Sequence, residues 1–166
     1  VSVDSASTRD IDDAFFVEEH PGGGWTARLA LACPALDWPF GSELDKAVLH
    51  RATSIYLPEA THHMLPECLS VEAYTLSQGV PRPALTLECR VREDGTVESC
   101  TPALARVKLA ANMTYEAVEE AVSDTAADNS EMLLRALALA KARLEARLRN
   151  NAVVIERPDP EYVLEH

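Results

Sequence analysis

The acidic segment near the amino end constrains the fold more than any other feature of the chain. Four aspartates and one basic residue fall within ten positions: Asp4, Asp10, Asp12, Asp13 and Arg9. The apolar run 14–17 follows them directly and is typical of a strand. Because like charges repel, packed structure must hold these carboxylates in place. The segment therefore predicts an acidic loop between two strands.

Clustered carboxylates stay together at neutral pH only with raised pKa values or bound cations. Ligand sets made of oxygen alone select Mg²⁺, Mn²⁺ or Ca²⁺ over zinc. A calcium-binding loop does not fit, because neither Gly at the sixth position nor Glu at the twelfth follows Asp4 or Asp10. We expect a magnesium site that handles phosphates, with Mn²⁺ as a substitute ion. The alternative is a solvated acidic turn.

Composition indicates a soluble globular protein, with 47% hydrophobic and 25% charged residues. A chain of 166 residues is long enough for one domain, or for part of one. No apolar run approaches the length of a membrane span, and the amino end lacks the layout of a secretory signal. We therefore expect a cytoplasmic protein that does not contact membranes.

The cysteines are far apart and form no CxxC pair; they are Cys33, Cys68, Cys89 and Cys100. Reduced thiols in the cytoplasm are the expected state. Cys68 with His62 and His63 matches no standard zinc spacing. The two histidines are more typical of exposed loop residues than of a general base, which would need a partner.

The net charge of −12 argues against a nucleic-acid substrate, because proteins that bind nucleic acids are usually basic on the contact face. Metal ions at the acidic segment would cancel part of this charge. Basic modules outside the chain would have the same effect.

Periodicity and turn residues predict the elements. Strands are expected at residues 13–19, 25–33, 84–92, 97–109 and 152–157, with turns at 21–24 and 93–96. Helices are expected at residues 42–53, 114–123 and 129–149, with loops at 34–41 and 59–83. Leucines 133, 137, 144 and 148 form a stripe on the longest helix, for a core or an interface. Hairpin pairing favours an α+β fold with a mixed, largely antiparallel sheet and flanking helices.

The acidic segment resembles the signature of the RNB domain, the catalytic domain of the ribonuclease II and ribonuclease R exoribonucleases. That signature is an Asp, a gap of five, then Asp-x-Asp-Asp before Ala, and positions 4 to 14 fit it. Further blocks follow in the family's order at residues 41–45, 51–58, 64–70 and 113–118. The amino-acid sequence of these blocks most resembles the ribonuclease II branch.

The resemblance implies Mg²⁺-dependent hydrolytic 3′→5′ degradation of single-stranded RNA, with release of nucleoside 5′-monophosphates. Residues 1–163 would be the N-terminal part of the catalytic domain, and residues 164–166 look like the remnant of an expression tag. The rest of the domain and flanking RNA-binding domains are the implied partners. Because the later blocks of the family pattern are missing, we expect this chain alone to have little or no activity.

Site roles follow from the same resemblance. Asp4, Asp10 and Asp13 are the predicted metal ligands, and Asp12 is assigned to the catalytic step, where it positions the metal or the attacking water. Two cations about 4 Å apart can activate water, align the attack and neutralise the leaving oxygen. Tyr56 matches the position at which the family stacks an aromatic ring on RNA, and stacking ignores base identity.

One departure from the family pattern supports a different class of function. Cys33 stands where the family usually has an acid, as the third residue after Ala30. The alternative is therefore a catalytically impaired member that keeps the fold and binds RNA or protein. A metal-dependent phosphohydrolase of small substrates is a third possibility.

Overall fold

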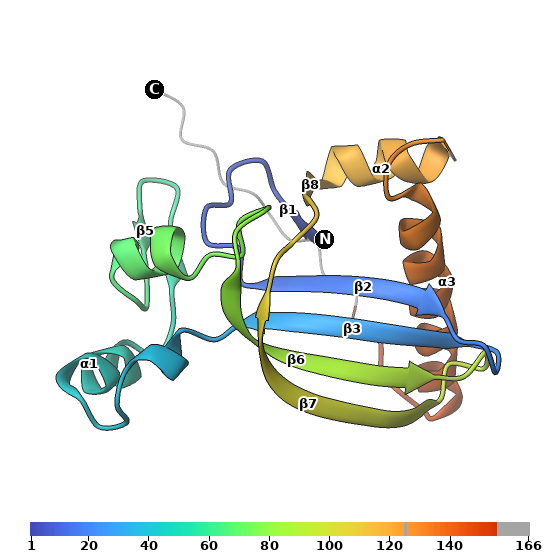
Figure 1. The fold of residues 1–166 in the computed structure, drawn as a ribbon, viewed down its shortest axis with the longest axis horizontal. Coiled ribbons are helices and arrows are strands. Elements are labelled where there is room, and N and C mark those ends of the chain that lie inside the picture. The colour runs from blue at the N-terminus through green and yellow to red at the C-terminus, as the bar shows by residue number, and fades with distance from the viewer. Residues whose placement is uncertain (125, 156–166) are drawn as a thin grey trace.

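A four-stranded antiparallel sheet forms the centre of the computed structural model, which describes residues 1–124 and 126–155. Its strand order is β2–β3–β6–β7 (Figure 1). The strands are β2 (Asp13–Glu19), β3 (Trp25–Ala32), β6 (Arg82–Val91) and β7 (Val97–Val107). The largely antiparallel sheet of an α+β fold is thus confirmed.

Two tight turns close this sheet at one end. Gly24 has a φ of +72°, and a Cβ there would lie 2.3 Å from the carbonyl oxygen of Val91. Only glycine fits so close a backbone approach in the left-handed region. The turn between β6 and β7 contains Gly95, which lies against the longest helix.

Two small sheets lie outside the central one. β1 (Ser2–Asp4) pairs in parallel with β8 (Asn112–Thr114), which brings the first strand beside a segment more than a hundred residues away. β4 (Ile55–Tyr56) pairs with β5 (Thr61–His62) in a short hairpin. The strand expected before the acidic loop is therefore present, whereas β8 was not predicted.

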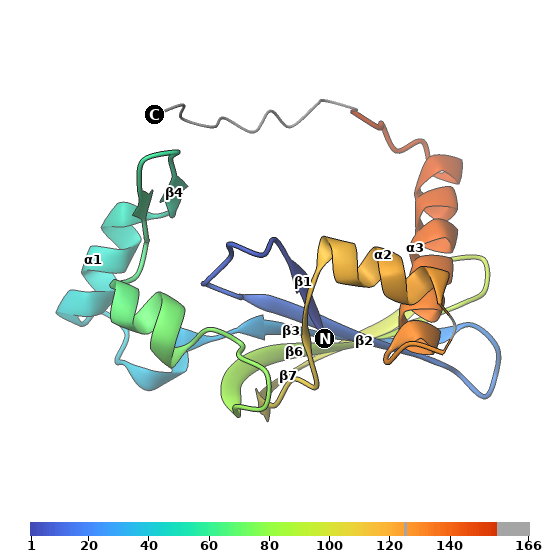
Figure 2. The same ribbon diagram turned by 90° about the horizontal axis from the view of Figure 1, so that it is seen from above.

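The described residues contain three α-helices, of which α3 packs against β2 of the central sheet. Ser42 caps α1 (Glu43–Arg51) and Thr114 caps α2 (Tyr115–Ser123), each by accepting a backbone hydrogen bond from the first turn. α3 (Ser130–Arg149) crosses the hairpin-turn end of the sheet, and α1 lies with β4–β5 at the opposite end (Figures 1 and 2).

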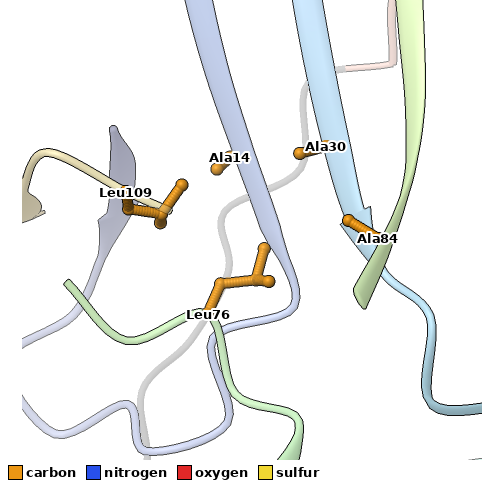
Figure 3. Packing of buried hydrophobic residues seen from close by; sticks show 5 residues of the cluster. All are labelled: Ala14, Ala30, Leu76, Ala84 and Leu109. Carbon is orange, nitrogen blue, oxygen red and sulfur yellow. The ribbon is translucent and has the colours of Figure 1, made fainter. Parts of the chain in front are cut away.

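Buried apolar residues form two clusters, one at each side of β2. Ala14, Ala30, Leu76, Ala84 and Leu109 meet where the sheet approaches the β1–β8 pair (Figure 3). The other cluster joins α2 and α3 to the first residue of the chain; it contains Val1, Ala121, Met132 and Leu133. The first cluster lies directly behind the acidic loop, because Ile11 packs on it.

Several predicted boundaries were wrong. The loop at 34–41 contains the short 3₁₀ helix η1 (Pro34–Asp37), and the loop at 59–83 contains β5 and the π-helical segment η2 (Cys68–Ala73). Residues 152–155 form no strand, while 156–157 and 164–166 lie outside the described residues. α1 stops at Arg51 because Ala52 adopts a left-handed conformation at φ 61°.

The leucine stripe of α3 is mostly exposed. Leu133 is 3% exposed, but Leu137, Leu144 and Leu148 are 40–50% exposed. Met132 and Ala146 take part in the packing instead. No helix in the described ranges has the length and apolar character needed to span a membrane.

Candidate metal and RNA site

The acidic loop connects β1 to β2 at the end of the sheet farthest from α3 (Figure 1). Asp4 is the last residue of β1, and Asp13 is the first residue of β2. Each end of the loop is therefore held by a strand. Repulsion among the four carboxylates makes such support necessary.

Asn112 fixes the β1 end of the loop. Its amide nitrogen donates to the Ser2 hydroxyl and to the Leu76 carbonyl, each at 3.0 Å. Its side-chain oxygen accepts a hydrogen bond from the Gln78 backbone N–H at 2.7 Å. Since Ser2 is fully buried, this bridge ties β1 firmly to the segment 76–78.

Thr75 fixes the other end of the loop. Its hydroxyl accepts from the Ile11 N–H at 2.9 Å and donates to the Arg9 carbonyl at 3.0 Å. The next residue, Leu76, donates its N–H to the Ile11 carbonyl at 2.8 Å. Thr75 is 6% exposed, so these bonds are shielded from water. Arg82 in turn donates to the Thr75 carbonyl.

A cleft of about 920 Å³ opens between this loop and the β4–β5 hairpin. Carboxylates, an aromatic ring and an imidazole line it together. The lining includes Asp4, Asp10, Asp12, Tyr56, His63, Arg9 and Glu67. An ion pair of 2.8 Å joins Arg9 to Glu67 at its rim, where both side chains are exposed.

Asp10 is the centre of the contacts across the cleft. The Tyr56 hydroxyl donates to Asp10 Oδ2 at 2.6 Å, while the Tyr56 side chain remains largely exposed. This hydrogen bond, followed by burial and the negative charge of Asp10, raises the pKa of Tyr56. His63 Nδ1 lies 3.4 Å from the same oxygen, with 12% of its side chain exposed.

The carboxylates of the loop influence one another. Burial raises the pKa of Asp12 most, followed by the negative charge of Asp13 and the weaker effects of Asp10 and Asp4. Asp4 Oδ2 is buried and has no hydrogen-bond partner among the described residues. A buried carboxylate oxygen without a donor is an atom that a cation would satisfy.

The structure thus brings Asp4, Asp10 and Asp12 to one cleft with Tyr56. Asp13 is exposed at the start of β2 and is absent from the lining. No three His, Cys, Asp or Glu side chains within residues 1–124 and 126–155 are already arranged around a metal position. The oxygen donors and the orphaned Asp4 oxygen fit a hard divalent cation, whose binding would have to draw the carboxylates closer.

Sequence reasoning missed His63, Thr75 and Asn112. The sequence predicts an exposed loop residue at His63, yet only 12% of its side chain is exposed and its Nδ1 lies 3.4 Å from Asp10. Thr75 and Asn112 reach the loop from 64 and 110 positions away, distances at which no local pattern carries a signal. Cys33 is not among the cleft-lining residues, but the preceding Ala32 donates its N–H to the Asp12 carbonyl.

Comparison with known proteins places these features in a family. The family model described as the RNB domain matches residues 1–166. Exoribonuclease 2 of Aeromonas hydrophila is 34% identical over 169 residues, covering 98% of this chain and 25% of that protein. Exoribonuclease 2 of Sodalis glossinidius is 32% identical, covering 99% of this chain and 27% of that protein. The chain spans about a quarter of these relatives.

Solved structures share the fold. Mycoplasma genitalium RNase R in complex with double-stranded RNA matches with a TM-score of 0.91 at 24% identity, covering 99% of this chain and 30% of that one. Yeast Ssd1, a pseudonuclease, matches with a TM-score of 0.74 at 14% identity, covering 89% of this chain and 18% of that one. At these identities, the likeness concerns the fold alone.

Proposed function

Because this chain belongs to the RNB domain family, we propose that it forms part of a hydrolytic 3′→5′ exoribonuclease. The substrate is single-stranded RNA, and the products are nucleoside 5′-monophosphates. The observation that carries the proposal is the cleft in which Asp4, Asp10 and Asp12 face an exposed aromatic ring. Curated relatives at 32–34% identity that bear the name Exoribonuclease 2 support it.

Divalent ions complete the chemistry of this cleft. Bound Mg²⁺, or Mn²⁺ in its place, would activate water and offset the charge that develops on the phosphate. Asp4 and Asp10 would hold the ions, with Asp13 as a further ligand from its place in the motif. Their oxygens suit these ions, and the buried Asp4 Oδ2 has no competing donor among the described residues.

Asp12 and Tyr56 have separate tasks in this proposal. Asp12 positions a metal ion or the attacking water, because its carboxylate lines the cleft beside Asp10 and Asp4. The Tyr56 ring offers a face to a base near the scissile bond, and its hydroxyl is fixed by Asp10. Stacking of this kind is worth about 1–3 kcal/mol per base and tolerates any sequence.

Activity in this proposal needs residues that the chain does not supply. The chain matches about a quarter of the length of its curated relatives, which supports a partnership with the rest of a catalytic domain and with flanking RNA-binding domains. We expect the isolated chain to have little or no exonuclease activity. Robust Mg²⁺-dependent shortening of single-stranded RNA by the 166-residue chain would contradict this.

The decisive experiment compares Asp12→Asn with the unaltered full-length protein. The enzyme proposal requires RNA shortening to collapse, by about a hundredfold or more as for loss of a charge-stabilising group, while RNA binding persists. Gel analysis measures shortening, and fluorescence anisotropy measures binding. Glu119→Gln, which changes an exposed acid of α2, is the matched control and should retain full activity.

The alternative is a non-catalytic member that binds RNA or protein, and Cys33 favours it. A thiol replaces the acid that usually follows this strand, close to the Ala32–Asp12 hydrogen bond. In that case the unaltered full-length protein binds without turnover, and Asp12→Asn changes neither property. Hydrolysis of nucleotides without any action on RNA oligomers would instead indicate a phosphohydrolase of small substrates.

A further inference from the structure

Two of the four cysteines lie side by side on adjacent strands of the central sheet. Cys89 on β6 and Cys100 on β7 are directly opposed register partners of an antiparallel pair. Both carry free thiols in this structure, as do the other two cysteines. The acidic cleft does not include either residue, so this pair has no part in the proposed hydrolysis.

The register suits a covalent bond between the two residues. Directly opposed residues of antiparallel strands have Cα atoms about 4.5–5.5 Å apart, and disulfides span Cα separations of about 4.4–6.8 Å. The side chains of register partners also project from the same face of the sheet. A disulfide at this position would therefore need little movement of the backbone.

The surroundings give the two thiols different reactivity. Cys100 is exposed on β7, an edge strand whose residues from Val97 to Arg106 are all exposed. Cys89 is partly buried between β3 and β7, opposite Ala27 on its other side. Burial, followed by a hydrogen bond with the Cys100 thiol, raises the pKa of Cys89 to about 11. Small disulfides in solution can thus reach Cys100, while Cys89 keeps its proton at neutral pH.

We propose that Cys89 and Cys100 are a site of reversible oxidation. The two thiols form a cross-strand disulfide by exchange with a low-molecular-weight disulfide such as oxidised glutathione. The Cys100 thiolate attacks one glutathione sulfur, forms a mixed disulfide and expels a glutathione thiolate. The Cys89 sulfur passes its proton to a released thiolate and attacks the Cys100 sulfur. The second glutathione leaves, so two protein thiols are oxidised and one glutathione disulfide is reduced to two thiols.

The other cysteines lack such an arrangement. Cys33 follows β3, and Cys68 begins η2, and neither is the register partner of a cysteine. They provide the matched comparison within the same chain. Oxidation at Cys33 or Cys68 should stop at a mixed disulfide, because no opposed thiol displaces the glutathione.

The experiment uses the chain with Cys33→Ser and Cys68→Ser, which retains only the opposed pair. After equilibration with oxidised glutathione, we expect a mass lower by two hydrogen atoms and no thiol left for alkylation. Trypsin should then release residues 52–90 joined to residues 93–106, because cleavage follows Arg90, Arg92 and Arg106 but not Arg82, which precedes a proline. Dithiothreitol should separate the two peptides.

A second variant tests whether oxidation of Cys89 requires Cys100. Cys100→Ala in the same background leaves Cys89 alone, and its thiol should remain open to alkylation after unfolding. Circular dichroism confirms that both variants keep the sheet. Two free thiols after oxidation, a glutathione adduct that persists on Cys100, or linkage only between separate chains would each overturn the proposal.

Discussion

Asp12 illustrates the conflict between stability and function at the scale of one residue. Its pKa is raised by burial and by the charges of Asp13, Asp10 and Asp4, so ionised Asp12 opposes folding at neutral pH. Asp12→Asn should therefore raise the free energy of unfolding of the metal-free chain, by only about 0.5 kcal/mol because Asp12 is partly exposed and solvent screens its charge. Urea denaturation in the presence of EDTA measures the change. Glu119→Gln should have no effect, and a loss of stability in Asp12→Asn would contradict the repulsion.

Thr75 matters because both bonds of its hydroxyl hold the acidic loop. Thr75→Val keeps the shape but leaves the Ile11 N–H and the Arg9 carbonyl without their partners. We expect a loss of about 2 kcal/mol in the free energy of unfolding, together with weaker Mn²⁺ binding measured by calorimetry. Thr86→Val is the control, because the Thr86 hydroxyl donates to the Ala103 carbonyl within the central sheet. Equal Mn²⁺ affinity in both variants would show that Thr75 does not position the loop.

Cys89 predicts a dependence of stability on alkaline pH. Its pKa of about 11 in the folded chain exceeds the ordinary 9.0, so the folded state holds the proton more tightly than the unfolded state. The resulting stabilisation is complete below pH 9.0 and is lost as the pH rises to about 11. Reduced wild type should thus lose more unfolding free energy than Cys89→Ser over this interval. Parallel curves for the two proteins would refute the assignment.

At the scale of elements, the junction between the β6–β7 turn and α3 tolerates no side chain at Gly95. Gly95 has a φ of +81°, and a Cβ would lie 2.1 Å from the Ala142 carbonyl oxygen. Gly41 has a similar φ of +77° but no atom within 4 Å of its virtual Cβ. Gly41→Ala should cost about 1 kcal/mol from backbone strain alone, and Gly95→Ala about 3 kcal/mol or more because overpacking adds to strain. Thermal unfolding of both variants checks the difference, and equal costs would contradict the close contact.

Elements were predictable where local pattern and burial agree. The strand at 13–19 and the helix at 129–149 came from periodicity, and the other two predicted helices begin at Ser42 and Thr114, the residues that cap them in the structure. The same reasoning did not predict the elements within the segment 59–83. Its helical turn at Cys68–Ala73 depends on contacts such as those of Arg82 with the Glu72 and Thr75 carbonyls, not on an amphipathic period.

The leucine stripe of α3 shows a second limit. Spacing identifies an apolar face but not what covers it, and three of the four leucines remain 40–50% exposed among the described residues. The sequence pattern therefore indicated the helix and the buried Leu133 correctly, but it did not identify Met132 and Ala146 as packing residues.

The grouping of the candidate site residues was predictable, but the residues that hold them in place were not. The spacing of the aspartates and the resemblance to the RNB domain pointed to Asp4, Asp10, Asp12 and Tyr56, which share one cleft. Asp13 does not line that cleft, and its role as a ligand stays a prediction. Thr75, Asn112 and His63 act across the fold, so their contribution depends on tertiary structure that no spacing encodes.

At the scale of the whole molecule, the net charge of −12 opposes RNA binding, so the proposed function requires divalent ions to offset it. The affinity of the isolated chain for a single-stranded oligoribonucleotide should rise with Mg²⁺ at constant ionic strength, by about tenfold, which corresponds to about 1.4 kcal/mol of ion-mediated contact. Anisotropy titrations with Mg²⁺ and with EDTA measure the change. Asp10→Asn should flatten the response, and equal affinity under both conditions would contradict a metal-bridged interface.

One short stretch of chain, residues 75–78, holds both ends of the acidic loop. Thr75 bonds to Ile11, which lies between Asp10 and Asp12. Asn112 of β8 links Leu76 and Gln78 to Ser2, in the strand that ends at Asp4. Both ends of the acidic loop are therefore held by the same segment, residues 75–78. A shift of residues 75–78 would move both ends of the acidic loop in the same direction. The distances between the aspartates would then change less than the position of the loop as a whole.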